Sequence, residues 1–449
     1  MSEQTTAIGD AAARFIALAP QRRFAPEIMD MAKMCLVDFV GVALGARHEP
    51  AAEAVRRAAL GWGSQGGAHI FLGPTAAPAV AALVNGTMGH CMDFDDTHLD
   101  GSGHLSTPTW SATLALAEHL GRSEREALAA FVTGFEVAAR LGAGGFGRRL
   151  QFIGFHPSSI FGRFAATAAA GALLGLDEGQ VANALGVAAT TASGLNASFG
   201  TDSKPFHLGK AALDGILAAQ LAAEGFEAAH HLLDADNGLS GALVQDRSVR
   251  IAPKEFSEGF ALLRNSFKPY ACCKATHAHV DLARSLADAV QGQQIARIVL
   301  GASPMADRVA SKPDPRTPLE AKFSVAYCVA LGLSGRRASE SDFTPERVAD
   351  PGLREILRKV ELNVQPDMDL NAGFMDVTLA DGRTLHAETT WALGNPDNPM
   401  GWDDMQAKFQ GLVEPALGAA WQELFAALRG FDAPGSLARV VELVTPRQN

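Results

Sequence analysis

The sequence predicts a mainly helical protein that combines a large all-helical domain with a smaller α+β domain. Apolar residues recur at three- and four-residue spacing through most of residues 8–260, which is the period of a helix. Short alternating apolar segments, typical of strands, follow residue 267, and helical spacing returns near the C-terminus. We therefore expect residues 1–267 and 396–449 to form the helical domain, and residues 268–395 to form the α+β domain.

Helix boundaries in the first domain carry clear start signals. Pro26 and Pro50 suit the first turn of a helix, where a missing N–H costs nothing. Ser123 and Glu126 match a capping box, and Asp177 opens a further helix. The helices that we expect are Ala11–Leu18, Pro26–Leu44, Pro50–Leu60, Ala77–His90, Pro108–Leu120, Glu124–Arg140, Ser158–Leu174, Asp177–Ala192 and Gly209–Glu224.

Strand signals mark the second domain. The segment Ala296–Gly301 is typical of a short buried strand. The dipeptide Asp381-Gly382 lies between two alternating segments, Asp376–Leu379 and Thr384–Leu393, and this pattern predicts a hairpin. The helices expected here are Thr276–Gln291, Leu319–Leu333 and Pro351–Lys359, followed by a helical region over residues 402–428 that returns to the first domain.

Composition argues against several kinds of partner. The formal net charge of −11 does not suit binding to nucleic acid or to an anionic membrane. The most apolar run, residues 164–176, is too short to cross a bilayer. Residues 1–6 lack the basic and apolar parts of a signal peptide, and five cysteines without a paired pattern fit a reducing compartment. We therefore expect a cytoplasmic protein.

A dense polar cluster at residues 90–106 is the strongest candidate site. It holds four carboxylates and three histidines between two apolar helical segments. Such a cluster is costly to bury unless its groups are paired or take part in chemistry. If the segment is helical, Asp93 and Thr97 share one face, and the glycines after them let His104 fold back toward the carboxylates. This arrangement suits proton transfer, although a solvated acidic turn is the simpler alternative.

Two metal-binding patterns fit this cluster poorly. An EF-hand loop beginning at Asp96 would have Thr107 at its twelfth position, where a bidentate Glu is required. A zinc-binding helix needs two histidines four residues apart with a Glu, whereas His90 and His98 are eight apart. We therefore expect no metal here.

Three further polar residues are candidates for binding an anionic substrate. Lys204 precedes a helix that we expect to begin near Gly209, and a cation beside a helix N-terminus can hold a carboxylate. His156 precedes a buried helix, and Lys268 lies at the expected domain junction, where ligand sites concentrate. A structural histidine and solvated lysines are the alternatives at these positions.

Six segments stand out along the chain: Met92–His98, Gly103-His104, Phe155–Ser159, Phe199–Pro205, Lys268–His277 and Glu320–Tyr327. In this order they resemble the MmgE/PrpD family over nearly the whole chain. That family includes 2-methylcitrate dehydratase, cis-aconitate decarboxylase and iminodisuccinate epimerase. The chain departs from the common family pattern after His104, where Leu105-Ser106 follows, and at Ala271-Cys272-Cys273.

The resemblance implies a homodimer without metal or organic cofactor, and an active site between the helical domain and an α+β lid. Tyr327 enters only through the resemblance, whereas the other site positions are also candidates from their own chemistry. The positions that match the family's active site are Asp93, Thr97, His104, His156, Lys204, Lys268 and Tyr327.

These residues predict proton abstraction at a carbon α to a carboxylate of a small di- or tricarboxylate. His104 or His156 would be the base and the other histidine the acid, with Asp93 orienting one of them. Lys204 and Lys268 would bind carboxylates, with the enolate oxygen as the alternative partner of Lys268. Thr97 and Tyr327 would donate further hydrogen bonds. We favour a hydro-lyase that resembles 2-methylcitrate dehydratase. An epimerase or isomerase, a decarboxylase, and a silent polycarboxylate-binding protein are the alternatives.

Overall fold

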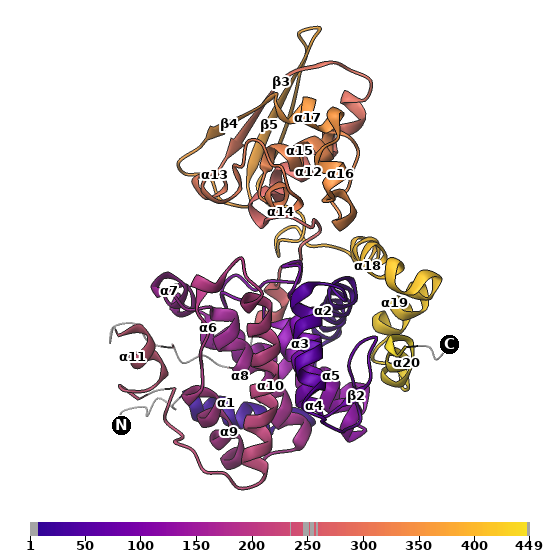
Figure 1. Ribbon diagram of the computed structural model, residues 1–449. Coiled ribbons are helices and arrows are strands. Elements are labelled where there is room, and N and C mark those ends of the chain that lie inside the picture. Colours follow the sequence, from indigo (N-terminus) through magenta and orange to yellow (C-terminus); the bar gives the residue numbers. More distant parts are fainter. Residues whose placement is uncertain (1–7, 234, 246–250, 252–255, 257–258, 447–449) are drawn as a thin grey trace. The chain divides into compact units, whose positions relative to one another are not determined.

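The computed structural model describes residues 8–446 except 234, 246–250, 252–255 and 257–258. Residues 1–6, which bear on the signal-peptide prediction, lie outside the described part. The chain divides into two compact units, each described below by itself (Figure 1). The first unit comprises residues 1–266 and 412–449, and the second comprises residues 267–411.

The first unit is helical and is built around α8, which is buried along nearly its whole length. Four helices, α4, α5, α6 and α10, lie close to one another or to α8 in its core. The helices are α1 (Ile8–Ala17), α2 (Pro26–Gly45), α3 (Pro50–Leu60), α4 (Pro78–Met88), α5 (Ser106–Leu120), α6 (Glu124–Gly142), α7 (Phe146–Ile153), α8 (Pro157–Leu174), α9 (Glu178–Thr190), α10 (Ser203–Ala223), α11 (Leu239–Val244), α19 (Trp421–Arg429) and α20 (Ser436–Val444).

Local signals placed several of these boundaries correctly. The Ser123 hydroxyl accepts a hydrogen bond from the Glu126 N–H, and the Glu126 carboxylate accepts one from the Ser123 N–H, so the expected capping box is present. Asp177 and Gln180 form a second box at the start of α9. Pro26 and Pro50 each occupy the first turn of their helix.

The predicted start of α10 near Gly209 was wrong, because the helix begins at Ser203. Pro205 fits the first turn, where no backbone N–H is needed. Gly209 instead lies inside the helix, where α10 crosses α4 closely. A Cβ at this position would come within 2.2 Å of the Leu83 carbonyl oxygen and 2.3 Å of the Thr87 hydroxyl oxygen. Lys204 is therefore a residue of the first helical turn and does not lie in a loop.

The second unit contains a four-stranded mixed sheet of order β4-β3-β5-β6. β3 (Ile295–Ala302) pairs in parallel with β4 (Val360–Val364) and in antiparallel fashion with β5 (Gly373–Leu379). β5 continues through the expected hairpin into β6 (Thr384–Thr389), which is shorter than the predicted segment. Gly382 has φ of +90° in that turn, a conformation that glycine adopts without strain.

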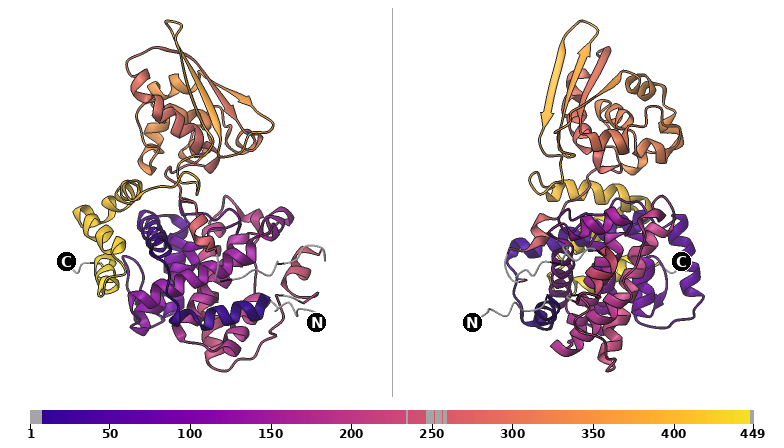
Figure 2. Two further views of the ribbon diagram at one scale, coloured as in Figure 1. Left: turned by 180° about the vertical axis from the view of Figure 1, so that it is seen from behind. Right: turned by 90° about the vertical axis from the view of Figure 1, so that its left-hand side faces the viewer.

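Helices cover one face of this sheet (Figure 2, right). Apolar side chains from α12 and α15 pack with those of β3 and β5 in a single core cluster. The helices of this unit are α12 (His277–Val290), α13 (Pro304–Ala310), α14 (Pro318–Lys322), α15 (Val325–Leu333), α16 (Pro345–Val348) and α17 (Pro351–Leu357), while α18 (Trp402–Leu417) runs across the boundary between the units.

The mainly helical class with a small α+β region is confirmed, but one further expected helix was wrong and three strands were missed. The helix expected over Leu319–Leu333 is broken, because Ser324 adopts an extended conformation and its hydroxyl caps α15 at Tyr327. Strand β4 and the short pair β1 (Ala68–His69) and β2 (Thr75–Ala76) were not predicted.

Within the described residues, no single helix is long and apolar enough to cross a membrane. Only α6 and α7, taken together as a bent pair, have the length and apolar composition of a membrane span.

Candidate functional site

The polar segment between α4 and α5 folds as a series of turns, so the helix considered for it does not form. Asp93 has φ of +50°, a left-handed conformation that a helix cannot contain. A pair of backbone hydrogen bonds between His98 and Gly103 then closes the loop. The expected return of His104 toward the carboxylates does occur, but through this closed loop.

His98 holds the loop in shape and has no direct role in the cluster. Its Nδ1 accepts a hydrogen bond from the Gly101 N–H at 2.8 Å, and its Nε2 donates to the Ala261 carbonyl oxygen at 3.0 Å. Burial lowers the pKa of His98 to about 4, so the ring is neutral at pH 7. This histidine is therefore structural.

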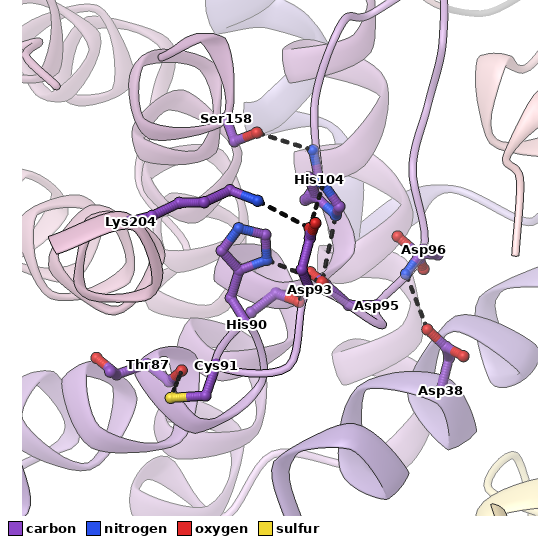
Figure 3. A network of polar contacts seen from close by, with 11 residues as sticks. Asp38, Thr87, His90, Cys91, Asp93, Asp95, Asp96, His104, Ser158 and Lys204 are labelled. Atoms are coloured by element: carbon purple, nitrogen blue, oxygen red, sulfur yellow. Dashed lines mark hydrogen bonds and ion pairs between the residues drawn. The ribbon is translucent and has the colours of Figure 1, made fainter. Parts of the chain in front are cut away.

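His104 lies between two carboxylates (Figure 3). Its Nε2 is 3.5 Å from Asp93 Oδ1, and its Nδ1 is 3.3 Å from Asp95 Oδ1. The His104 backbone N–H also donates to the Ser158 hydroxyl at 3.1 Å, which fixes the loop against α8. Each ring nitrogen thus lies near a carboxylate oxygen, while Nδ1 is buried and makes no hydrogen bond within the described residues.

Asp95 is a buried carboxylate with three neighbours. His90 Nδ1 donates to its Oδ1 at 2.8 Å, and the Thr107 hydroxyl donates to its Oδ2 at 2.8 Å. Burial opposes ionisation of Asp95, but His104 and His90 outweigh it and hold the pKa of the carboxyl well below its usual range. Burial also lowers the pKa of His90 to about 4. A fixed negative charge therefore lies beside His104 Nδ1.

Lys204 completes the cluster from the first turn of α10. Its Nζ is 2.9 Å from Asp93 Oδ1 and 5.2 Å from the centre of the Phe199 ring. The side chain of Asp93 is 46% exposed and that of Lys204 is 18% exposed. The ion pair therefore marks an accessible side of an otherwise buried cluster.

His156 is the N-cap residue of α8. Its ring centre is 6.3 Å from that of His90 and 4.8 Å from that of Phe199. Its Nδ1 is 3.0 Å from Nδ1 of His207, so one of the two rings donates to the other. Burial, together with the nearby charges of His90 and Lys204, lowers the pKa of His156 to about 2. His156 is therefore neutral at pH 7.

Three predicted site residues remain, one in the first unit and two in the second. Thr97 exchanges backbone hydrogen bonds with Ser266, and its hydroxyl is buried without a hydrogen-bond partner among the described residues. Lys268 and Tyr327 belong to the second unit and are both buried. The Tyr327 hydroxyl donates to the Asp342 carbonyl oxygen at 2.9 Å.

Four residues of the cluster, His90, Asp93, Asp95 and His104, could offer ligand atoms to a metal ion. One ligand atom of each lies within 4.8 Å of the others. Several of these atoms already have partners, since Lys204 pairs with Asp93 and both oxygens of Asp95 accept hydrogen bonds. A cation would have to displace the Lys204 ammonium, so this set fits a metal poorly.

Sequence reasoning missed the roles of His90, Asp95 and His207. The sequence suggests only a zinc-ligand pattern for His90, and Asp95 is one of four acids in this segment with nothing to single it out. Their pairing depends on the left-handed turn at Asp93, which brings together residues five apart. His207 follows Lys204 by three residues, which is helical spacing, but the predicted helix began too late to use it.

Both units match models of one protein family. The MmgE/PrpD N-terminal domain matches residues 10–252, and the MmgE/PrpD C-terminal domain matches residues 270–429. The cis-aconitate decarboxylase of Homo sapiens is 32% identical over 355 residues, which cover 74% of this chain and 72% of the human protein. The Mus musculus enzyme is 31% identical over 353 residues, covering 74% and 71% of the two chains.

A more distant relative extends the match. The cis-aconitate decarboxylase of Aspergillus terreus is 25% identical over 403 residues, or 82% of this chain and 81% of the fungal protein. The matched N-terminal domain includes the whole cluster from His90 to His207, and the two domain matches together span most of the sequence. By these matches, the chain belongs to the MmgE/PrpD family of enzymes acting on carboxylates.

Proposed function

We propose that this protein is a cofactor-independent decarboxylase of a small tricarboxylate such as cis-aconitate. The observation that carries the proposal is the His104 ring, held between Asp93 and Asp95 beside the Lys204 ammonium. This arrangement offers a proton and a positive charge at one accessible place. Relatives that act on cis-aconitate support decarboxylation as the reaction.

The reaction needs one proton and charge stabilisation. The bond to the departing carboxylate breaks as carbon dioxide leaves, and its electron pair forms a new C=C bond. The electrons of the original double bond move to the far alkene carbon, which lies next to a second carboxylate and takes up the proton. Negative charge builds up on that carboxylate in the transition state, so nearby cations lower the barrier.

His104 is the proton donor in this scheme. Its two carboxylate contacts suit the protonated ring, whereas His156 is kept neutral by burial and by its neighbours. Neutral His156 would instead accept a hydrogen bond. Lys204 would bind a substrate carboxylate when Asp93 releases it, and Asp93 would then orient His104 alone.

The remaining site residues have proposed roles of the same kind. Lys268 would bind a second carboxylate or the developing negative charge. Thr97 has a hydroxyl without a partner among the described residues and would donate a hydrogen bond. Tyr327 would donate only after its hydroxyl leaves the Asp342 carbonyl oxygen.

The relatives change which of the candidate reactions we favour. The sequence alone favours a hydro-lyase, because dehydration, epimerisation and decarboxylation all need similar stabilisation of negative charge. The relatives named here are decarboxylases, and two of them exceed 30% identity over about three quarters of the chain. Decarboxylation is therefore the reaction that we propose, and dehydration is the outcome that the same assay would detect.

Proton NMR in deuterated water tests the proposal. With cis-aconitate, we expect release of carbon dioxide and a product carrying one deuterium at the former alkene carbon. The panel also contains 2-methylcitrate, citrate, tartrate and iminodisuccinate, and every assay is repeated with EDTA. If another substrate of the panel loses water or is inverted instead, dehydration or epimerisation would replace decarboxylation as the proposed reaction. If EDTA abolishes activity and a divalent metal restores it, the cofactor-independent scheme is rejected.

His104→Asn tests the proton donor. We expect kcat to fall by about 10²- to 10⁴-fold, as is usual when a general acid is removed. His386→Asn is the matched control, because His386 is an exposed histidine of β6 paired with Asp376. Activity of His104→Asn within threefold of the wild type, with unchanged thermal unfolding, would rule out this role.

A further inference from the structure

A buried lysine of the second unit, Lys274, has no hydrogen-bond partner among the described residues. The Nζ of Lys274 is inaccessible and makes no hydrogen bond within that part of the chain. A buried ammonium without a partner is costly, and such groups are normally paired or needed for a ligand. Lys274 lies in the turn that precedes α12, six residues after Lys268.

The charges around Lys274 make its burial less favourable. Lys268 and Lys408 lie near enough to repel it, and both are themselves buried. Asp281 attracts the Lys274 ammonium, but its carboxylate is used elsewhere. Its Oδ1 pairs with the Tyr270 hydroxyl, and its Oδ2 accepts the Leu393 N–H at 2.7 Å.

These surroundings alter the protonation of Lys274. Burial, and then the charge of Lys268, lower its pKa to about 8. An anion placed among the three lysines would relieve their repulsion and supply the missing acceptor. The cluster of Lys268, Lys274 and Lys408 is therefore arranged for a ligand carrying negative charge.

We infer that Lys274 is a substrate-binding residue, which receives one carboxylate of a polycarboxylate together with Lys268 and Lys408. The choice of a carboxylate as the ligand rests on the proposed function. A second cation beside Lys268 favours substrates with three carboxylates over those with two. Lys274 is then a specificity-determining residue.

Equilibrium binding tests this inference without relying on turnover. Tricarballylate, a saturated tricarboxylate, and glutarate, a dicarboxylate, are titrated calorimetrically into the full-length protein and its variants. We expect Lys274→Met to bind tricarballylate about 10- to 100-fold more weakly, the usual effect of losing one charge-assisted hydrogen bond. Glutarate binding should change much less, and Lys274→Arg should keep the preference for tricarballylate.

Thermal unfolding separates a binding role from a structural one. Because the free protein buries Lys274 without a partner among the described residues, we expect Lys274→Met to melt at the wild-type temperature or above it. A structural role predicts a lower melting temperature instead. Lys312→Met is the matched control, because Lys312 is an exposed lysine of the same unit, and it should bind both ligands as the wild type does.

The outcomes distinguish this inference from the proposed function. Unchanged tricarballylate binding by Lys274→Met would overturn the inference and leave decarboxylation untouched. Binding that depends on Lys274, without turnover of any substrate in the panel, would support the inference and reject the proposed reaction. A wild-type protein that binds neither tricarballylate nor cis-aconitate would overturn the inference.

Discussion

The carboxyl group of Asp96 lies buried beside that of Asp38, which accepts the Asp96 backbone N–H at 2.9 Å. Burial and the negative charge of Asp38 raise the pKa of Asp96 to about 8. The folded state therefore binds a proton that the unfolded state releases near pH 4. By linkage, the stability contributed by protonated Asp96 is complete at low pH and is lost as pH rises toward and through about 8.

Asp96→Asn should remove the loss of stability that the wild type shows as pH rises. We expect its free energy of unfolding to exceed that of the wild type by roughly 1–3 kcal/mol at pH 8, with a much smaller difference at pH 5. Urea unfolding at the two pH values measures both differences. Asp100→Asn, an exposed acid in the same loop, is the control and should change stability by less than about 0.5 kcal/mol. Equal effects of Asp96→Asn at both pH values would contradict this account.

At the scale of elements, the crossing of α4 and α10 depends on the absence of a side chain at Gly209. Since a methyl group there would meet the Leu83 carbonyl oxygen at 2.2 Å, Gly209→Ala must push the helices apart. We expect a loss of about 1–3 kcal/mol in the free energy of unfolding. We also expect weaker substrate binding, because α10 carries Lys204 in its first turn.

A second helical glycine provides the control for this prediction. Gly411 lies within α18 and is exposed, and a Cβ added there would meet no atom within 4 Å. Gly411→Ala should therefore stabilise the protein by up to about 1 kcal/mol through helix propensity alone. Chemical denaturation of both variants compares them directly, and a stability loss shared by both would show that contact with α4 is not the cause.

At the scale of the whole molecule, the first unit exposes apolar side chains on two adjoining segments. Phe152 is 82% exposed and Leu195 is 56% exposed, and a hydrogen bond of 2.7 Å from Asn196 to the Gln151 carbonyl oxygen joins their segments. Exposed apolar patches of this kind commonly mark protein interfaces. The homodimer implied by the resemblance stays a prediction, as does the cytoplasmic location.

Light scattering after gel filtration should give twice the chain mass of 47.1 kDa. Replacing Phe152 and Leu195 together by Ser should shift the mass toward that of one chain. Trp62→Ser, at another exposed apolar position, should leave the mass unchanged. A single-chain mass for the wild type would reject the dimer.

Local signals explain which parts of this molecule could be predicted from its sequence. Capping boxes and apolar spacing act within one or two turns, so most helices and the hairpin could be predicted. The start of α10 could not, because Gly209 is explained by contact with α4, more than a hundred residues earlier. Strand β4 was missed because its five residues follow a helix almost directly.

The candidate site also has a part that could be predicted from the sequence and a part that could not. The residue types and the glycines near His104 predict that this ring returns to the carboxylates, and the structure brings Asp93, His104 and Lys204 together. The partner of each group could not be predicted, because it depends on the turn geometry at Asp93 and on the position of α10. The roles of Lys268 and Tyr327 stay predictions.

The left-handed backbone at Asp93 limits which substitutions this position can accept. Only glycine, asparagine and aspartate adopt such a conformation at little cost, and β-branched residues are penalised heavily. Of these three, aspartate alone provides the negative charge that faces Lys204. Selection at this position therefore acts on backbone conformation and on charge at once. A lineage with glycine or asparagine here could keep the turn and lose the activity.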